Sequence, residues 1–176
     1  VPIVATMTFD TNGSTMMGVP PAQLVDIYRE TVPRLAAYGA NCGVGAADLI
    51  GTIAAMRRHA SPQDILIAKG NCGIPEFVDG EIKYSGTPEL MAEYACLARD
   101  IGARIIGGCC GTTPMHLTAM RDALVAHQVR TAPEIDTIVE ILGPVTAGTR
   151  AVCASTGSLP ETDASSRRSR NSRRRK

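Results

Sequence analysis

Short apolar runs alternate along the chain with longer segments in which apolar residues recur every three or four positions. A short apolar run rich in β-branched residues is typical of a buried strand, and the wider spacing is typical of a helix with one apolar face. The pattern predicts strands over residues 2–8, 40–42, 64–69 and 104–108, and helices over 20–38, 47–59, 87–101, 113–127 and 134–142. This alternation indicates an α/β fold of about four βα units with a parallel sheet.

The pattern also indicates where ordered structure stops. A loop is expected over residues 70–86, between the third strand and the following helix. Apolar periodicity ends at residue 142, and the chain then becomes rich in Ser and Arg. Such a composition cannot bury enough apolar surface to offset the entropy of ordering. We therefore expect a folded domain over residues 1–142 and a disordered basic tail over residues 143–176.

The charges are divided unevenly between these two parts. The last eleven residues carry seven of the eighteen Lys and Arg side chains, so the other 165 residues hold eleven basic and seventeen acidic side chains. A body with a net charge of −6 does not attract nucleic acid through bulk charge. No apolar run is long enough to span a bilayer, and no leader pattern precedes the first strand, which begins without a Met. We expect a cytoplasmic protein that acts on small molecules, and an N-terminus that is missing.

Three cysteines lie where predicted strands end. Cys42 closes the second strand, and Cys109 and Cys110 follow the fourth. Loops at the carboxyl ends of parallel strands share one edge of the sheet, so these thiols can converge. Three thiolates suit Zn²⁺ with a fourth position left for a substrate thiol, and the alternatives are buried thiols or a vicinal disulfide.

The other cysteines and the histidines favour structural roles. Cys72 in the loop and Cys96 within a helix are interpreted as packing residues, and Cys153 as a free thiol in the unstructured tail. The three histidines fall on helices or helix ends, where surface or capping roles are favoured over metal binding, with His116 left open because it follows the cysteine loop closely.

Several segments resemble those of homocysteine S-methyltransferases. The resemblance covers about residues 2–142, and the double-cysteine segment is its most specific part. Its segments are Gly39-Ala40-Asn41-Cys42, Gly107-Gly108-Cys109-Cys110-Gly111-Thr112, Asn71-Cys72-Gly73-Ile74-Pro75, and, less specifically, Met7-Thr8-Phe9 and Thr15-Met16-Met17-Gly18. Cys72 stands where that family usually has Ala, and overall similarity favours the bacterial betaine–homocysteine enzymes.

The resemblance implies a zinc enzyme that methylates the thiol of homocysteine to give methionine. It implies a (β/α)₈ TIM-type barrel, of which this chain holds only the C-terminal half. Carried over residue by residue, Cys42, Cys109 and Cys110 would bind Zn²⁺, Asn41 and Asn71 would lie near the substrate, and no catalytic residue is expected beyond the zinc ligands. Betaine is the favoured methyl donor, with S-methylmethionine or a methyl-folate and cobalamin system as alternatives.

Two other functions are left open by the sequence. The chain could be an inactive zinc-binding fragment of such an enzyme, because the half-barrel expected to complete the site is absent. Open strand edges would also favour association with a further copy of the chain. A binding module that works through the basic tail is the third reading, and the acidic body speaks against it.

Overall fold

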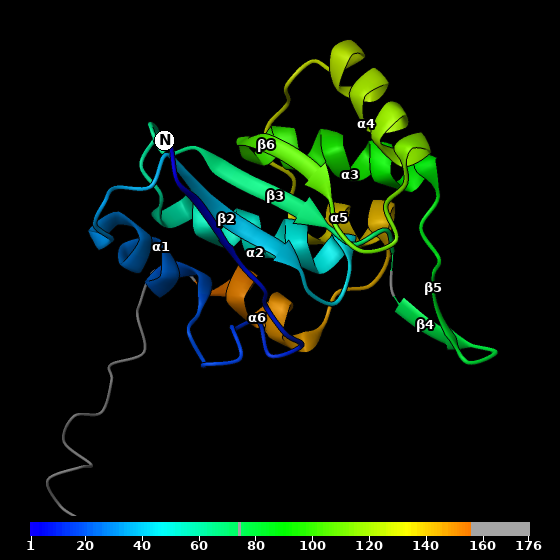
Figure 1. Cartoon of the computed structure of the whole chain (residues 1–176), viewed down its shortest axis with the longest axis horizontal. Helices are drawn as coiled ribbons and strands as arrows, with labels where there is room; N and C mark the ends of the chain where they lie inside the picture. The colour runs from blue at the N-terminus through cyan, green and yellow to red at the C-terminus, as the bar shows by residue number, and fades with distance from the viewer. Residues whose placement is uncertain (74, 156–176) are drawn as a thin grey trace, which may run out of the picture.

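A sheet of four parallel strands forms the centre of the molecule (Figure 1). The computed structural model describes residues 1–73 and 75–155. Across the sheet, the strands follow the order in which they occur along the chain: β1 (Val4–Met7), β2 (Ala37–Cys42), β3 (Leu66–Gly70) and β6 (Ala103–Gly108). This confirms the α/β fold with parallel βα units. The arrangement is compatible with part of a TIM-type barrel, and the closed barrel stays a prediction.

Helices cover one face of this sheet. In Figure 1, α2 and α3 lie behind the strands, while the front face of the sheet is turned to the viewer. None of the helices in the described part of the chain is both long and apolar enough to cross a membrane. The helices are α1 (Pro21–Glu30), α2 (Ala46–His59), α3 (Pro88–Ile101), α4 (Pro114–Ala126), α5 (Ile135–Leu142) and α6 (Ala147–Ala154).

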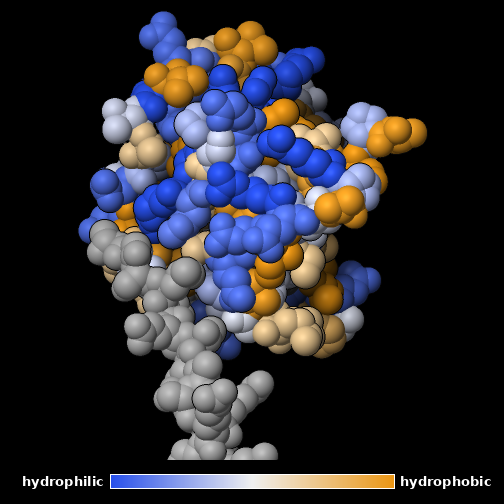
Figure 2. Space-filling model, turned by 90° about the vertical axis from the view of Figure 1, so that its left-hand side faces the viewer, coloured by the Kyte–Doolittle hydropathy of each residue, from blue (hydrophilic) through white to orange (hydrophobic). Residues whose placement is uncertain are grey.

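The core lies between the helices and the sheet. Alternate residues of a strand point to opposite faces, and Leu66 and Ala68 of β3 belong to the buried apolar cluster together with Ile50 and Ile53 of α2. Ile67 and Lys69 therefore project from the other face. The end of the sheet at which the strands begin is covered mostly by hydrophilic residues (Figure 2).

The first helix is shorter than the sequence pattern predicts. A helix over residues 20–38 was expected, but α1 ends at Glu30 and β2 already begins at Ala37. The reason is Pro33, which has no N–H to donate and disfavours the helical conformation of the residue before it. Tyr38 consequently joins the sheet, where its hydroxyl donates to the Asp64 carboxylate over 2.7 Å.

The expected loop over residues 70–86 contains a β-hairpin. Its strands are β4 (Pro75–Val78) and β5 (Glu81–Tyr84), and it extends away from the body at the right of Figure 1. Asp79 and Gly80 form the turn, both with positive φ angles (54° and 84°). An Asp-Gly pair between short strands is a strong hairpin signal, so this hairpin has a local cue in the sequence.

The sequence pattern predicts a disordered tail that starts at residue 143, but part of this segment is helical. Residues Ala147–Ala154 form α6, which packs against α2. The buried Asp48 carboxylate of α2 accepts hydrogen bonds from the backbone N–H and the hydroxyl of Thr146, over 3.0 and 2.7 Å. Residues 156–176 of the predicted tail lie outside the described residues. The division into residues 1–142 and 143–176 remains a prediction in other respects.

We predict that Gly39→Ala strongly destabilises the fold. A Cβ on Gly39 would lie 1.9 Å from the carbonyl oxygen of Ile67 in the neighbouring strand, so the two strands would have to separate. The free energy of unfolding, measured by urea denaturation, should fall by about 3 kcal/mol or more.

Gly107→Ala is the matched control in another strand of the same sheet. The nearest atom to a Cβ there is the Cγ of Lys69 at 3.9 Å, an ordinary contact distance. Its unfolding free energy should change by less than about 1 kcal/mol. Equal stability losses in the two variants would contradict the close approach of β2 and β3 at Gly39.

Candidate metal centre

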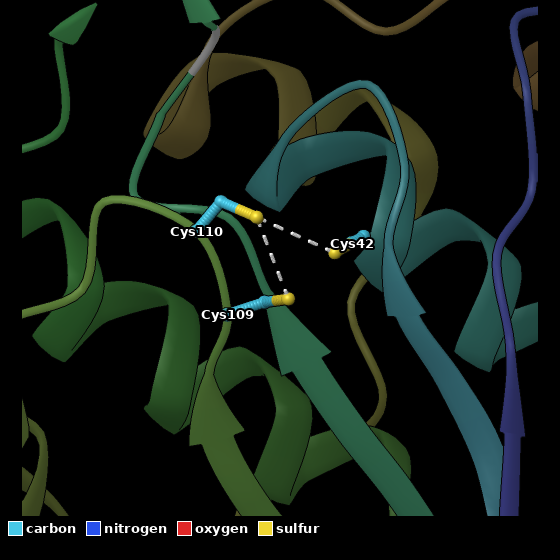
Figure 3. A group of neighbouring side chains, drawn as sticks. All are labelled: Cys42, Cys109 and Cys110. Carbon is cyan, nitrogen blue, oxygen red and sulfur yellow. Dashed lines mark hydrogen bonds between the residues drawn. The ribbon is translucent and has the colours of Figure 1, made fainter. Parts of the chain in front are cut away.

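The three cysteines meet at the carboxyl edge of the sheet. Cys42 is the last residue of β2, while Cys109 and Cys110 directly follow β6. Only β3 separates these two strands in the sheet, and all of the strands run in the same direction. Figure 3 shows the three side chains pointing toward one another from the two strand ends.

The spacing of the sulfur atoms suits a metal ion. The Cys110 Sγ lies 3.7 Å from the Cys42 Sγ and 3.8 Å from the Cys109 Sγ, and all three atoms lie within 4.8 Å of one another. A tetrahedral zinc ion with Zn–S bonds of about 2.3 Å would hold its sulfur ligands about 3.8 Å apart. The cluster could therefore bind such an ion without a large rearrangement.

Backbone hydrogen bonds hold the cysteine loop against the end of β3. The Cys109 N–H donates to the carbonyl of Gly70 over 2.7 Å, and the Cys72 N–H donates to the carbonyl of Cys110 over 2.9 Å. The loop also needs glycine at two positions. A Cβ on Gly108 would lie 2.1 Å from the Thr112 hydroxyl oxygen, and Gly111 has a φ of 76°.

The thiols of the cluster differ in acidity. Burial acts to raise the pKa of Cys42, but hydrogen bonds from Cys109, the Asn41 side chain and Cys110 stabilise its thiolate and lower its pKa overall. Burial raises the pKa of Cys109 to about 11, and its hydrogen bonds to Cys42 and Cys110 add to the effect. In the metal-free protein, the Cys42 thiol therefore ionises at a lower pH than the Cys109 thiol.

The two asparagines predicted to contact substrate both lie beside the cluster. Asn41 precedes Cys42, and its amide donates to the Thr8 hydroxyl over 3.3 Å. Asn71 follows β3 and is buried, with its amide donating to the Gly43 carbonyl over 2.9 Å. The Asn71 Oδ1 has no hydrogen-bond partner among the described residues, so it is an acceptor left for a ligand. Their contact with substrate stays a prediction.

The remaining cysteines lie outside the cluster that Cys42, Cys109 and Cys110 form in the described part of the chain. Cys72 is buried and donates to the Gly86 carbonyl over 3.1 Å, in line with a packing role. Cys96 was expected in the core but is only half-buried, because it lies at the margin of the packed face of α3. Cys153 was expected in an unstructured tail, but it lies in α6 with its thiol 3.4 Å from the Gly51 carbonyl.

His116 caps α4 rather than reaching the cysteines. Its Nδ1 accepts from the Thr113 N–H over 3.1 Å, and its Nε2 lies 3.3 Å from the Gly86 carbonyl. His59 is the last residue of α2, and the His127 Nε2 lies 2.7 Å from the Asp100 carboxylate. The structure brings none of the three into the described thiol cluster.

Tyr84 is a neighbour of the cluster that the sequence analysis did not select. The last residue of β5, it packs its ring against the cysteine loop, where a Cβ on Gly111 would lie 2.4 Å from the Tyr84 Cγ. A hydrogen bond to Cys110 raises the pKa of the Tyr84 hydroxyl. The Asp79-Gly80 turn signals the hairpin to which Tyr84 belongs, while its contact with Gly111 follows from the three-dimensional fold.

A comparison of the sequence with known protein families agrees with this geometry. The profile of the homocysteine S-methyltransferase family matches residues 1–124. The chain belongs to this family.

The relatives of this chain differ widely in length. Methionine synthase of Mycobacterium tuberculosis (strain ATCC 25618 / H37Rv) is 29% identical over 127 residues, which cover 70% of this chain and 10% of that protein. Methionine synthase of Mycobacterium leprae (strain TN) is 27% identical over 136 residues, covering 76% and 11%. Betaine–homocysteine S-methyltransferase 1 of Xenopus laevis is 27% identical over 142 residues, covering 72% and 34%. The chain thus spans about a tenth to a third of the length of these relatives.

We predict that alkylation of the metal-free protein distinguishes the thiols by pH. Because the pKa of Cys42 is lowered and that of Cys109 is raised to about 11, iodoacetamide at pH 8 should modify Cys42 faster than Cys109. The difference should shrink as the pH approaches 11. Peptide mass spectrometry measures both rates, and faster labelling of Cys109 at pH 8 would contradict the assigned acidities.

We predict that each cluster cysteine is needed for tight metal binding. Cys42→Ser, Cys109→Ser and Cys110→Ser should each weaken zinc affinity about 100-fold or more, since even the loss of groups that only orient ligands costs 10- to 100-fold. Competition with a chromogenic chelator gives the affinities. Cys96→Ser, a half-buried cysteine of α3, should bind zinc like the unchanged chain. Unaltered affinity in all three cluster variants would exclude this metal centre.

Proposed function

We propose that Cys42, Cys109 and Cys110 hold a zinc ion at which homocysteine is methylated to methionine. The observation that carries the proposal is the spacing of 3.7 and 3.8 Å between the sulfur atoms, which suits a tetrahedral ion. A bound zinc ion supplies Lewis acidity that favours the deprotonated, nucleophilic form of a substrate thiol.

The residues around the cluster would orient the substrate. The amide of Asn71 is fixed by its hydrogen bond to Gly43, which leaves its unpartnered Oδ1 to accept a hydrogen bond from the substrate. The side chain of Asn41, the residue before Cys42, is held by its hydrogen bond to Thr8. A substrate held between these side chains loses rotational freedom before reaction, which lowers the barrier to methyl transfer.

Betaine is the methyl donor that we favour. One relative, from Xenopus laevis, is named for this donor and for homocysteine. In the reaction the homocysteine sulfur forms a bond to a methyl carbon as the bond from that carbon to the betaine nitrogen breaks. The thiol gives up its proton to solvent, and the donor leaves as a tertiary amine. The need for reduced thiols supports a cytoplasmic location.

A second candidate is a metal-binding and thiol-binding half-site without turnover. It is favoured by the share of the relatives that the chain spans, about a tenth to a third. It is also favoured by the sheet, whose edge strands β1 and β6 each have one partner in the described part of the chain. The two candidates share the metal centre and differ in whether methionine forms.

We expect the cobalt-substituted protein to report homocysteine binding. Addition of homocysteine should intensify the thiolate-to-cobalt absorption bands, because a further sulfur enters the coordination sphere. The Cys110→Ser variant is the control and should give a much weaker response. If the absorption spectrum of the cobalt-loaded chain does not change when homocysteine is added, both candidates are overturned.

Methionine production then separates the two candidates. The zinc-loaded chain is incubated with homocysteine and betaine carrying deuterated methyl groups, and labelled methionine is measured by mass spectrometry. Labelled methionine that is absent with Cys110→Ser supports the enzyme. Homocysteine binding without labelled methionine supports the half-site.

A further inference from the structure

Lys69 lies beside the metal centre and has no part in the function described so far. The strand register pairs Lys69 of β3 with Asn41 of β2 and with Gly107 of β6. The next row along the same strands pairs Gly70 with Cys42 and with Gly108. Lys69 is therefore one residue, or about 3.3 Å along the strand, from the row that contains Cys42.

The side chain of Lys69 projects from the face of the sheet that α2 and α3 leave uncovered. Its neighbour Ala68 belongs to the buried cluster beneath the helices, and successive strand residues point to opposite faces. The Lys69 Cγ lies 3.9 Å from the place that a Cβ on Gly107 would take. The stem of Lys69 therefore lies on the β6 side of β3, close to Gly107.

This lysine has no counter-charge in the described part of the chain. The ion pairs found there involve Arg29, Arg121, His127 and Arg150. Lys69 is nevertheless half-buried, whereas Lys83 of β5 is exposed. The stem of a half-buried lysine is covered while its ammonium stays accessible to a ligand. An anionic ligand group would be a counter-charge that the described residues do not supply.

We propose that Lys69 binds the α-carboxylate of the thiol substrate. The assignment rests on the proposed function. In homocysteine the carboxyl carbon is four bonds from the sulfur, a span of about 5 Å from ordinary bond lengths. A lysine ammonium reaches about 6 Å from its Cα on a flexible stem. If the substrate sulfur lies at the row that contains Cys42, the carboxylate falls within range of Lys69. Asn41 lies beside Lys69, with which it is paired in the sheet.

This role gives the site a means of discrimination between thiols. Cys42, Cys109 and Cys110 alone would accept any small thiol, since they offer only a place for sulfur. A charged hydrogen bond to the carboxylate adds selectivity for amino-acid thiols. Lys69 is in this sense a specificity residue and takes no part in the methyl transfer itself.

The test compares L-homocysteine with 3-aminopropane-1-thiol, which lacks only the carboxylate. Both are titrated into the cobalt-loaded chain and followed by the thiolate-to-cobalt absorption. The unchanged chain should bind homocysteine roughly 10- to 100-fold more tightly, as expected for one hydrogen bond to a charged group. Lys69→Met should remove this preference and leave the affinity for the aminothiol unchanged.

Two further variants control for the charge and for general effects. Lys69→Arg keeps the cation and should retain a measurable preference for homocysteine. Lys83→Met removes an exposed lysine of the hairpin and should behave like the unchanged chain. Metal stoichiometry and thermal unfolding of each variant confirm that the site is intact.

The possible failures are distinguishable. Thiol binding by Lys69→Met with the homocysteine preference intact would overturn the assignment of Lys69 and leave the proposed function standing. Equal affinity of the unchanged chain for the two thiols would likewise overturn the assignment of Lys69 and leave the proposed function standing. Absence of any spectral response to either thiol in the unchanged chain would overturn the proposed function and, with it, the role of Lys69.

Discussion

The parallel pairing of β2, β3 and β6 is the constraint on which the candidate site depends. Cys42 and Cys109 are 67 positions apart in the sequence, and they meet because β3 pairs in parallel with β2 on one side and with β6 on the other. The hydrogen bond from the Cys109 N–H to the Gly70 carbonyl continues this register beyond the end of β6. Any change that slid β3 along its neighbours would move the thiols apart, whatever their own chemistry.

Small residues allow this pairing to be so close. Gly39 faces the backbone of Ile67, and Gly108 leaves space for the Thr112 side chain. Neither glycine offers a reactive group. Both are needed because the distance between neighbouring elements there is too short for a side chain, and the positions of the sulfur atoms depend on that distance. The chemistry of the site is in this way set partly by residues that have no side chain.

The convergence of the cysteines could be predicted from the sequence because it follows from topology. Strands that alternate with helices run parallel, and parallel strands end at one edge. The hairpin and α6 were missed for different reasons. The hairpin had a local signal in Asp79-Gly80. In contrast, α6 is short and weakly patterned, and contacts with distant residues such as Asp48 hold it in place. Interactions of that kind cannot be read from neighbouring letters of a sequence.

In the part of the chain that the structure describes, β1 and β6 each pair with one other strand, and this has a consequence for protein engineering. Each edge strand can hydrogen-bond to one more strand, and a strand added there through a crossover helix would run in the same direction as the existing four. Such an addition would leave the register of β2, β3 and β6 untouched. Further βα units could therefore be fused beside β1 or β6 while the distances between the sulfur atoms stay the same.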